Sequence, residues 1–180
     1  MKVTVTAALC ATFAATAYAA PDSSSSAQQS QAPRLITAAN ITLPEAIRTV
    51  EAKAGGRAIS ASYDAEHGNE GRYEIIVLTD DGARVEKLDQ NAYDGQVNAE
   101  WSAPAAEVYP TVSEGSLAQV PMSLESAIAT AMNKSDGRVT DATLENTPGN
   151  DRYIVTVART DGSVETLEIG SDGSVESVAG

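Results

Sequence analysis

The residues best suited to chemistry are few in this chain. It has one histidine, His67, one cysteine, Cys10, and one tryptophan, Trp101. An imidazole serves as a general base when a hydroxyl and a carboxylate are held beside it. His67 stands in a polar stretch, residues 64–71, which is rich in turn-forming residues. We interpret it as a solvated loop residue. The sequence therefore predicts no catalytic residue and a protein that is not an enzyme.

Acidic residues raise the question of a calcium site, because 25 Asp and Glu face 12 Lys and Arg. Asp89, Asn91 and Asp94 lie close together in the sequence, and Asp80 is adjacent to Asp81. Calcium requires six or more oxygen ligands from a preorganised loop. The segment 89–95 misses the EF-hand spacing by one residue, and no glutamate follows at the bidentate position. We therefore interpret these residues as parts of turns and expect no metal and no cofactor.

Charge and composition exclude several classes of protein. The formal net charge of -13 disfavours binding to nucleic acid or to an anionic membrane surface. One Cys and one His cannot form a zinc site, and one Cys cannot form an internal disulfide. A hydrophobic content of 42% with only 4% aromatic residues predicts a globular protein with an aliphatic core.

The N-terminus has the pattern of a secretory signal peptide over residues 1–19. Lys2 is followed by an uncharged, mostly apolar run, residues 3–17, and Ala17-Tyr18-Ala19 matches a signal peptidase site. Cleavage after Ala19 would remove Cys10 and leave a mature chain with no membrane span. We expect a periplasmic or secreted protein. Residues 20–40, rich in Ser, Gln and Ala, are predicted to form a flexible tether.

The rest of the chain contains one pattern written twice. Collinear matches run through both halves, and the spacing between matched positions shortens slightly, only between predicted elements. The matches are 43–47 with 124–128, 56–57 with 137–138, 72–73 with 152–153, 81–82 with 161–162, 85–86 with 164–165 and 94–95 with 172–173. We predict a first repeat over 41–101, a Pro- and Ala-rich linker over 102–121, and a second repeat over 122–180.

Each repeat is predicted to begin with a helix. Thr42 and Glu45 form a capping box around Pro44, and Gly55 ends the helix in the left-handed conformation. Ser123 is the corresponding cap in the second repeat. Apolar residues recur at helical spacing in both. The stripes are Leu43, Ala46, Ile47, Val50 and Ala54 in the first helix, and Leu124, Ala127, Ile128 and Ala131 in the second, which Asp136-Gly137 is expected to close.

Three strands are predicted to follow each helix. Alternating apolar residues place one side of each strand against the helix, as in Tyr73-Glu74-Ile75-Ile76-Val77. Asp-Gly pairs at 81–82 and 161–162 favour tight hairpins, and those at 94–95 and 172–173 favour further turns. Val85 and Leu88 have opposite parity, which indicates a bulge. The predicted fold class is α+β, with two tandem copies of a small unit made of one helix and a three-stranded antiparallel sheet.

This ordered pattern resembles the PepSY domain family. Both halves carry a Leu-x-x-Ala-Ile helix, a Gly-containing break, a strand that opens on an aromatic residue, and an Asp-Gly turn. The resemblance covers 43–97 and 124–175 and implies a cystatin- or PepSY-like fold, export, and a non-catalytic role. The family is related to protease propeptides, which implies regulation or inhibition of a peptidase. No His-Glu-x-x-His follows here, so such a target would be a separate protein.

Two functions stay open at this point. The first is a binding module for a protein partner, such as an exported peptidase. The second is a passive structural or accessory protein of the cell envelope, for example a partner of a membrane redox protein. We favour Trp101 as a cap on the first repeat's core, and its alternative role is an exposed anchor for a partner. Tyr73 and Tyr153 are predicted to be core residues whose hydroxyls reach the sheet rim. The oligomeric state is left open.

Overall fold

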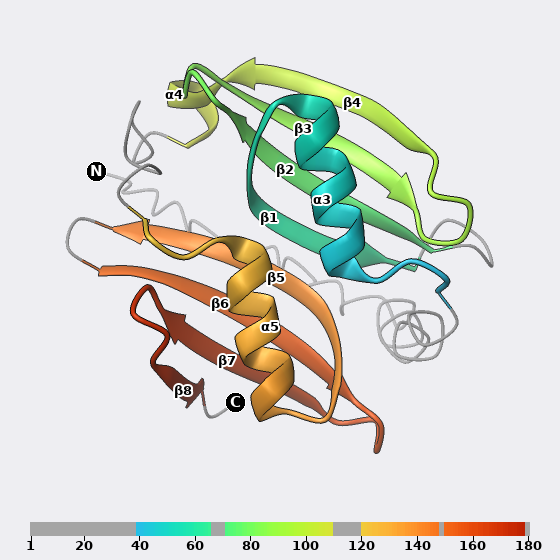
Figure 1. Ribbon diagram of the computed structural model, residues 1–180, viewed down its shortest axis with the longest axis vertical. Coiled ribbons are helices and arrows are strands. Elements are labelled where there is room, and N and C mark those ends of the chain that lie inside the picture. The colour runs from blue at the N-terminus through green and yellow to red at the C-terminus, as the bar shows by residue number, and fades with distance from the viewer. Residues whose placement is uncertain (1–38, 66–70, 110–119, 148–149, 179–180) are drawn as a thin grey trace, which may run out of the picture.

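The computed structural model describes residues 39–65, 71–109, 120–147 and 150–178. In these ranges the chain forms one antiparallel sheet of eight strands, with the two long helices lying side by side on one face (Figure 1). The strand order is β4-β3-β2-β1-β5-β6-β7-β8. The elements in chain order are α3 (Leu43–Ala54), β1 (Gly56–Asp64), β2 (Arg72–Thr79), β3 (Arg84–Asn91), β4 (Val97–Pro104), α4 (Ala105–Val108), α5 (Leu124–Lys134), β5 (Gly137–Thr147), β6 (Asn150–Arg159), β7 (Val164–Gly170) and β8 (Val175–Val178).

The prediction of two small units of one helix and three strands is wrong. Within the described ranges each half supplies one long helix and four strands, and the halves share a single sheet. The fourth strands, β4 and β8, lie at the two edges of the sheet, and most of their residues are exposed. Apolar residues alternate in β4, at Val97, Ala99, Trp101 and Ala103, whereas β8 has only four residues, too few for a period-two pattern to identify a strand.

The two halves join through β1 and β5 in the middle of the sheet. Ala61 pairs with Ala142, and Ser60 and Ser62 pair with Thr143 and Asp141. Ala61 and Ala142 are matched positions of the two halves, with the same spacing as the two helices, so corresponding residues face each other across a local two-fold axis. Each half alone would leave the outer edge of this strand unpaired, and mutual pairing satisfies both edges.

The helix predictions are confirmed. In α3 the Glu45 carboxylate accepts from the backbone N–H of Thr42 at 2.8 Å, and Gly55 follows with φ of 66°. Ser123 caps α5 by accepting from the N–H of Ser126 at 3.1 Å. The closure of α5 differs, because Ser135 ends the helix and Gly137 begins β5. The buried faces match the predicted stripes, apart from Ala54, which is partly buried.

The structure confirms the predicted turns but places the irregularity of β3 differently from the prediction. All four Asp-Gly turns are confirmed, with glycine φ values between 68° and 87°. An irregularity does occur between Val85 and Leu88, but only in the pairing of β3 with β4, whose register shifts between Lys87 and Leu88; β3 pairs with β2 without a shift. The two residues instead point to opposite faces and are both buried, with α4 packed against β3. The register shifts of the inner strands fall at Ile59 in β1 and at Thr140 in β5, which are again matched positions of the two halves.

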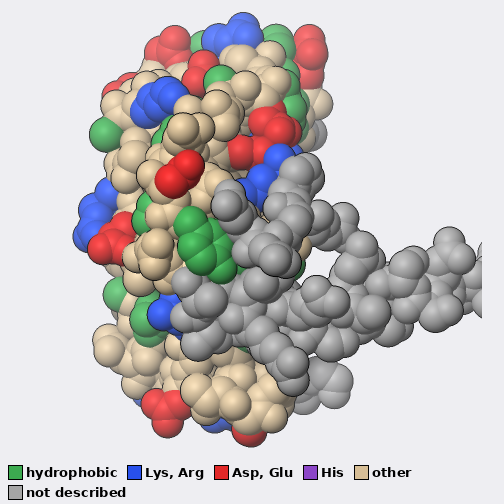
Figure 2. Space-filling model, turned by 90° about the vertical axis from the view of Figure 1, so that its right-hand side faces the viewer, with side chains coloured by type: hydrophobic (Ala, Val, Ile, Leu, Met, Phe, Trp, Pro, Cys, Tyr) green, Lys and Arg blue, Asp and Glu red, His purple; other side chains and the backbone are tan. Residues whose placement is uncertain are grey.

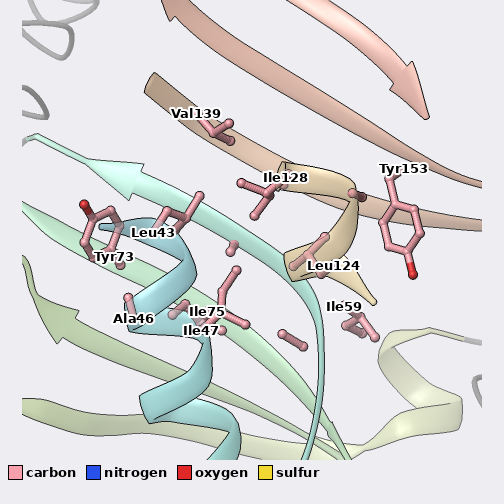
Figure 3. Close-up of a cluster of buried hydrophobic side chains, with 14 of the residues drawn as sticks. Leu43, Ala46, Ile47, Ile59, Tyr73, Ile75, Leu124, Ile128, Val139 and Tyr153 are labelled. Atoms are coloured by element: carbon pink, nitrogen blue, oxygen red, sulfur yellow. The ribbon is translucent and has the colours of Figure 1, made fainter. Parts of the chain in front are cut away.

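One hydrophobic core runs under both helices. Leu43 and Ile47 of α3 and Leu124 and Ile128 of α5 pack against the sheet in one continuous cluster with Tyr73 (Figure 3). The cluster is aliphatic apart from tyrosines, as the composition predicted. Because α3 and α5 also contact each other, the halves share a core as well as a sheet.

Several predicted segments lie partly or wholly outside the described residues. These are the signal peptide, nearly all of the tether, His67 and half of the linker. Within the predicted linker, residues 102–104 complete β4 and 105–108 form α4. No helix in the described ranges is long and apolar enough to cross a membrane.

Candidate protein-binding surface

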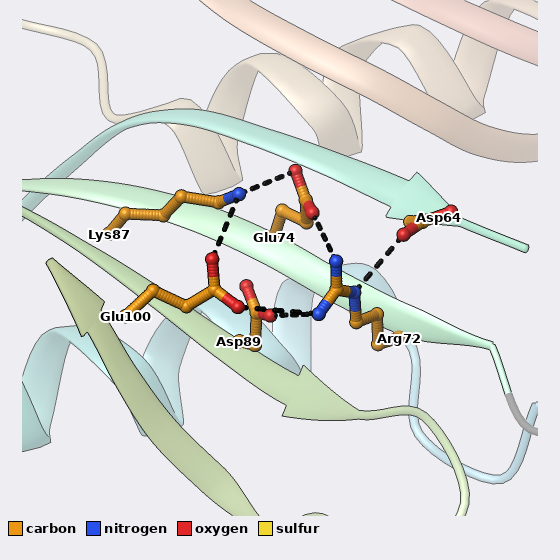
Figure 4. Close-up of polar contacts among 6 residues, drawn as sticks. All are labelled: Asp64, Arg72, Glu74, Lys87, Asp89 and Glu100. Carbon is orange, nitrogen blue, oxygen red and sulfur yellow. Dashed lines mark hydrogen bonds and ion pairs between the residues drawn. The ribbon is translucent and has the colours of Figure 1, made fainter. Parts of the chain in front are cut away.

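Strands β1 to β4 carry a cluster of charged side chains on the face opposite α3 and α5. Figure 4 shows them on the near side of the sheet, with the helices behind it. We call this cluster the charged face. Its members are Asp64, Arg72, Glu74, Lys87, Asp89 and Glu100. Strand alternation places them there, because the neighbouring Tyr73, Ile75 and Leu88 point to the core.

Arg72 is the centre of the charged face. Its guanidinium pairs with four carboxylates: Asp89 at 2.5 Å, Glu74 at 2.9 Å, Asp64 at 3.1 Å and Glu100 at 3.4 Å. Lys87 adds pairs to Glu74 at 3.0 Å and to Glu100 at 3.4 Å. Two cations among four carboxylates hold the side chains of four strands in one network and leave an excess of negative charge.

Asp89 differs from the other carboxylates in its burial. Its side chain is 8% exposed, against 36% for Glu100. Burial, reinforced by a hydrogen bond with Glu100, raises the pKa of Asp89 to about 6, although Arg72 acts in the opposite direction. The same hydrogen bond lowers the pKa of Glu100. Near neutral pH the charged face therefore includes one carboxyl that is close to its titration point.

The second half has a smaller counterpart of this network. Arg152 corresponds to Arg72 and pairs with Glu145 at 2.8 Å and with Glu168 at 2.9 Å. All three side chains are more exposed than Asp89. Glu74 and Lys87 correspond to Ile154 and Thr166. The full network therefore belongs to the first half alone.

Trp101 lies on β4, at the edge of the sheet beside the charged face. It pairs with Lys87, whose side chain is on the charged face, and adjoins Glu100. The favoured prediction, that Trp101 caps the core, is wrong, since the residue is 38% exposed and is not part of the buried cluster. The structure instead places the indole where another molecule could reach it.

The residues considered for calcium act separately. Asn91 accepts from the N–H groups of Tyr93 and Asp94, and Asp94 accepts from Gln96. Asp81 accepts from the N–H of Ala83, and Asp89 pairs with Arg72. Among the described residues no three His, Cys, Asp or Glu side chains are grouped to hold a metal ion. The structure thus assigns these side chains to turns or to the charged face.

The core positions of Tyr73 and Tyr153 are confirmed. Each is 1% exposed. The hydroxyl of Tyr73 donates to the carbonyl of Ile41 at 2.6 Å, and that of Tyr153 donates to the carbonyl of Met122. Both hydroxyls therefore fix the chain just before a helix, where a buried polar group finds a partner.

Sequence reasoning missed the charged face. The signal available was the Arg-Tyr pair at 72–73 and again at 152–153. In each half this pair opens a strand, with the tyrosine in the core and the arginine on the opposite face. Strand pairing, which brings Asp89 and Glu100 to Arg72, was needed to show which carboxylates would join it.

Comparison with known proteins gives little beyond this geometry. No protein-family profile matches the sequence, and no curated protein matches it. Among solved structures, the chain is similar to a candidate lipoprotein from Clostridium difficile 630, at 14% sequence identity and a TM-score of 0.45. The alignment covers 78% of this chain and 95% of that one.

Proposed function

We propose that this protein is an exported, non-catalytic binding module that docks on a protein partner, and that the partner is an exported peptidase. The observation that carries the binding role is Trp101, an aromatic side chain 38% exposed on an edge strand. The signal-peptide pattern supports export, and the PepSY resemblance supports the choice of a peptidase.

The surroundings of Trp101 suit a side-chain interface. Tryptophan is enriched among residues that dominate binding energy, usually inside a ring of polar contacts. Lys87 and Glu100 supply such contacts and are already held by the Arg72 network, so little side-chain entropy is lost on binding. The excess of acidic residues favours a partner with a basic surface.

Addition of a partner strand to β4 is less favourable than side-chain docking. The register of β4 shifts between its pairs with Lys87 and Leu88, and the strand ends at Pro104. Bulges and prolines are common features that prevent edge strands from pairing with other chains. We therefore assign binding to the face around Trp101 and not to the free backbone of β4.

The matched spacing of the two halves supports their origin by duplication. Helices, bulges and the Arg-Tyr pairs recur at nearly constant spacing. The Arg72 network and Trp101 occur in the first half only. The edge strand of the second half, β8, has four residues against eight in β4. On this proposal the second half completes the sheet, and the first half has diverged to bind.

A capture experiment tests the proposal. Purified protein is immobilised and exposed to the exported fraction of its source, with and without an active-site peptidase inhibitor. We expect capture of a peptidase that Trp101→Ala lowers at least tenfold, because hot-spot tryptophans contribute about 2 kcal/mol or more. Val164→Ala is the matched control, since Val164 is 63% exposed on the other half.

The outcomes separate the two functions. Recovery of no peptidase in either condition would contradict the regulatory role. Equal capture by Trp101→Ala and by the wild type would contradict the assigned surface. Recovery only of envelope proteins, including membrane redox proteins, would favour the accessory role.

A further inference from the structure

Two carboxyl groups of the charged face lie side by side at the edge of the sheet. Asp89 of β3 and Glu100 of β4 both accept from Nη1 of Arg72, at 2.5 Å and 3.4 Å (Figure 4). Two carboxyls on one donor atom are close enough to affect each other's ionisation. Burial and then their mutual hydrogen bond raise the pKa of Asp89, and the same bond lowers the pKa of Glu100. A hydrogen bond between two carboxyls requires one proton, so this pair holds a proton between two strands.

One oxygen atom of Asp89 shows where that proton belongs. The side chain is 8% exposed, and within the part of the chain that the structure describes its Oδ1 is buried and accepts no hydrogen bond. Its Oδ2 accepts from Arg72. A buried carboxylate oxygen without a donor is unfavourable, whereas the same oxygen with a proton becomes a donor to Glu100. The geometry therefore fits a protonated Asp89 beside an ionised Glu100.

The other charged groups around Asp89 come from three strands. Asp64 lies on β1, Arg72 and Glu74 on β2, and Lys87 on β3 (Figure 4). Figure 2 shows the side of the molecule at the right of Figure 1, where acidic and basic side chains of the first half are interspersed in the upper part of the view. Both Arg72 and Lys87 pair with more than one carboxylate. Ionisation of Asp89 therefore adds a negative charge to a cluster whose two cations are already shared.

Glu100 connects the two carboxyls to Trp101. In the pairing of β4 with β3, Trp101 is opposite Lys87 and Ala99 is opposite Leu88, so Glu100 is the extra residue of a bulge. Among the described strands, β4 is at the edge of the sheet and is hydrogen-bonded to β3 alone. The contacts of the Glu100 carboxyl therefore help to fix the backbone beside the indole.

We infer that the proton shared by Asp89 and Glu100 is a switch that regulates the surface around Trp101. With the proton in place, Glu100 stays against Asp89 and the bulge presents the indole in a fixed position. When the proton passes to solvent, the two carboxylates repel each other, Glu100 moves away and the bulge loosens. Binding through Trp101 is therefore stronger in mildly acidic solution. The regulatory role rests on the proposed function, whereas the switch itself is measured without a partner.

The chain offers two control variants. Glu168 occupies the position of Asp89 in the second half, pairs with Arg152 and is 28% exposed, so solvent reaches its carboxyl. Glu168→Gln therefore removes the corresponding charge without changing the switch. His67→Gln is the second control, because an ordinary imidazole titrates at about pH 6.5 and would give a similar midpoint.

The test uses the fluorescence of Trp101, which is the one tryptophan of the chain. The emission maximum and acrylamide quenching of the purified protein are followed from about pH 5 to about pH 8, a range that brackets the titration. We expect a midpoint of about 6, with a more accessible indole at high pH, in the wild type and in both controls. Asp89→Asn should keep the low-pH signal throughout, because an amide donates to Glu100 and accepts from Arg72 as a protonated carboxyl does. Glu100→Gln should lower the midpoint by about one unit, because a neighbouring negative charge is removed.

The outcomes separate the switch from the proposed function. A flat signal in the wild type, a titration that persists in Asp89→Asn, or one that disappears in His67→Gln would overturn the switch. Capture of the peptidase at the two ends of the pH range tests the regulation. We expect stronger capture at the lower pH by the wild type and equal capture at both by Asp89→Asn, and equal capture by the wild type would overturn the regulatory role. Recovery of no peptidase at either pH would contradict the proposed function, and the fluorescence titration would still decide the switch.

Discussion

Replacing Arg72 by methionine is expected to destabilise the fold far more than the same change at Arg152. Arg72 is the partner of Asp89, whose side chain is 8% exposed. Removing one member of a buried ion pair costs about 3–5 kcal/mol, because a charge is left without compensation. The carboxylates around Arg152 are 44% and 28% exposed. Exposed pairs contribute about 0–1 kcal/mol each. Since Arg152 makes two such pairs, the two variants should differ by at least about 1 kcal/mol.

Urea denaturation at pH 7, followed by circular dichroism, measures this difference. With a urea dependence of about 2 kcal/mol per M, the midpoint of Arg72→Met should lie at least about 0.5 M below that of Arg152→Met. The gap should narrow near pH 5, because a protonated Asp89 no longer needs a cation. Equal losses in the two variants, or a gap that does not depend on pH, would refute the assignment of Asp89 as a buried carboxylate held by Arg72.

Three further predictions follow from local geometry. The pKa of Asp89 is about 6, above its unfolded value. The native protein therefore keeps a proton on Asp89 that the unfolded chain has already lost, and the free energy of unfolding falls as pH rises from about 4 to about 6. Asp89→Asn should remove that fall in stability, and an unchanged pH profile would contradict the shift. Gly137→Ala places a Cβ against the carbonyl oxygen of Ala158, closer than van der Waals contact allows, and should cost about 2–3 kcal/mol. Gly162→Ala, in open space at φ of 87°, should cost only about 1 kcal/mol. Equal melting temperatures of the Gly137→Ala and Gly162→Ala proteins would contradict the steric argument. Tyr73→Phe removes the bond to Ile41 and should cost about 1–2 kcal/mol in thermal unfolding, whereas no loss would show that the bond is not needed.

Local sequence patterns predict some features of each half correctly and miss others. Helix caps at Thr42 and Ser123, the apolar stripes and the Asp-Gly turns depend on residues a few positions apart, and the sequence predicts them. The regular pairing of β3 with β2, in spite of the opposite parity of Val85 and Leu88, was not predictable in the same way. Val85 is buried because α4 packs on the face that the alternation marked as exposed.

The candidate site depended on long-range pairing. Trp101 was recognised as notable because it is the sole tryptophan, but its exposure follows from β4 being an edge strand. The carboxylates around Arg72 come from three other strands and from its own, and no spacing along the chain indicates which of the acidic residues would reach it.

The amino-acid sequence by itself determined the two long helices, their N-terminal caps, the turns and the correspondence between the halves, because these rest on short-range hydrogen bonds and on periodic burial. Only the tertiary structure decided that β1 would pair with β5 and make one sheet from two halves. Either edge of a strand offers the same backbone donors and acceptors. The choice between edges therefore depends on the packing of α3, α5 and the shared core, which no local pattern specifies.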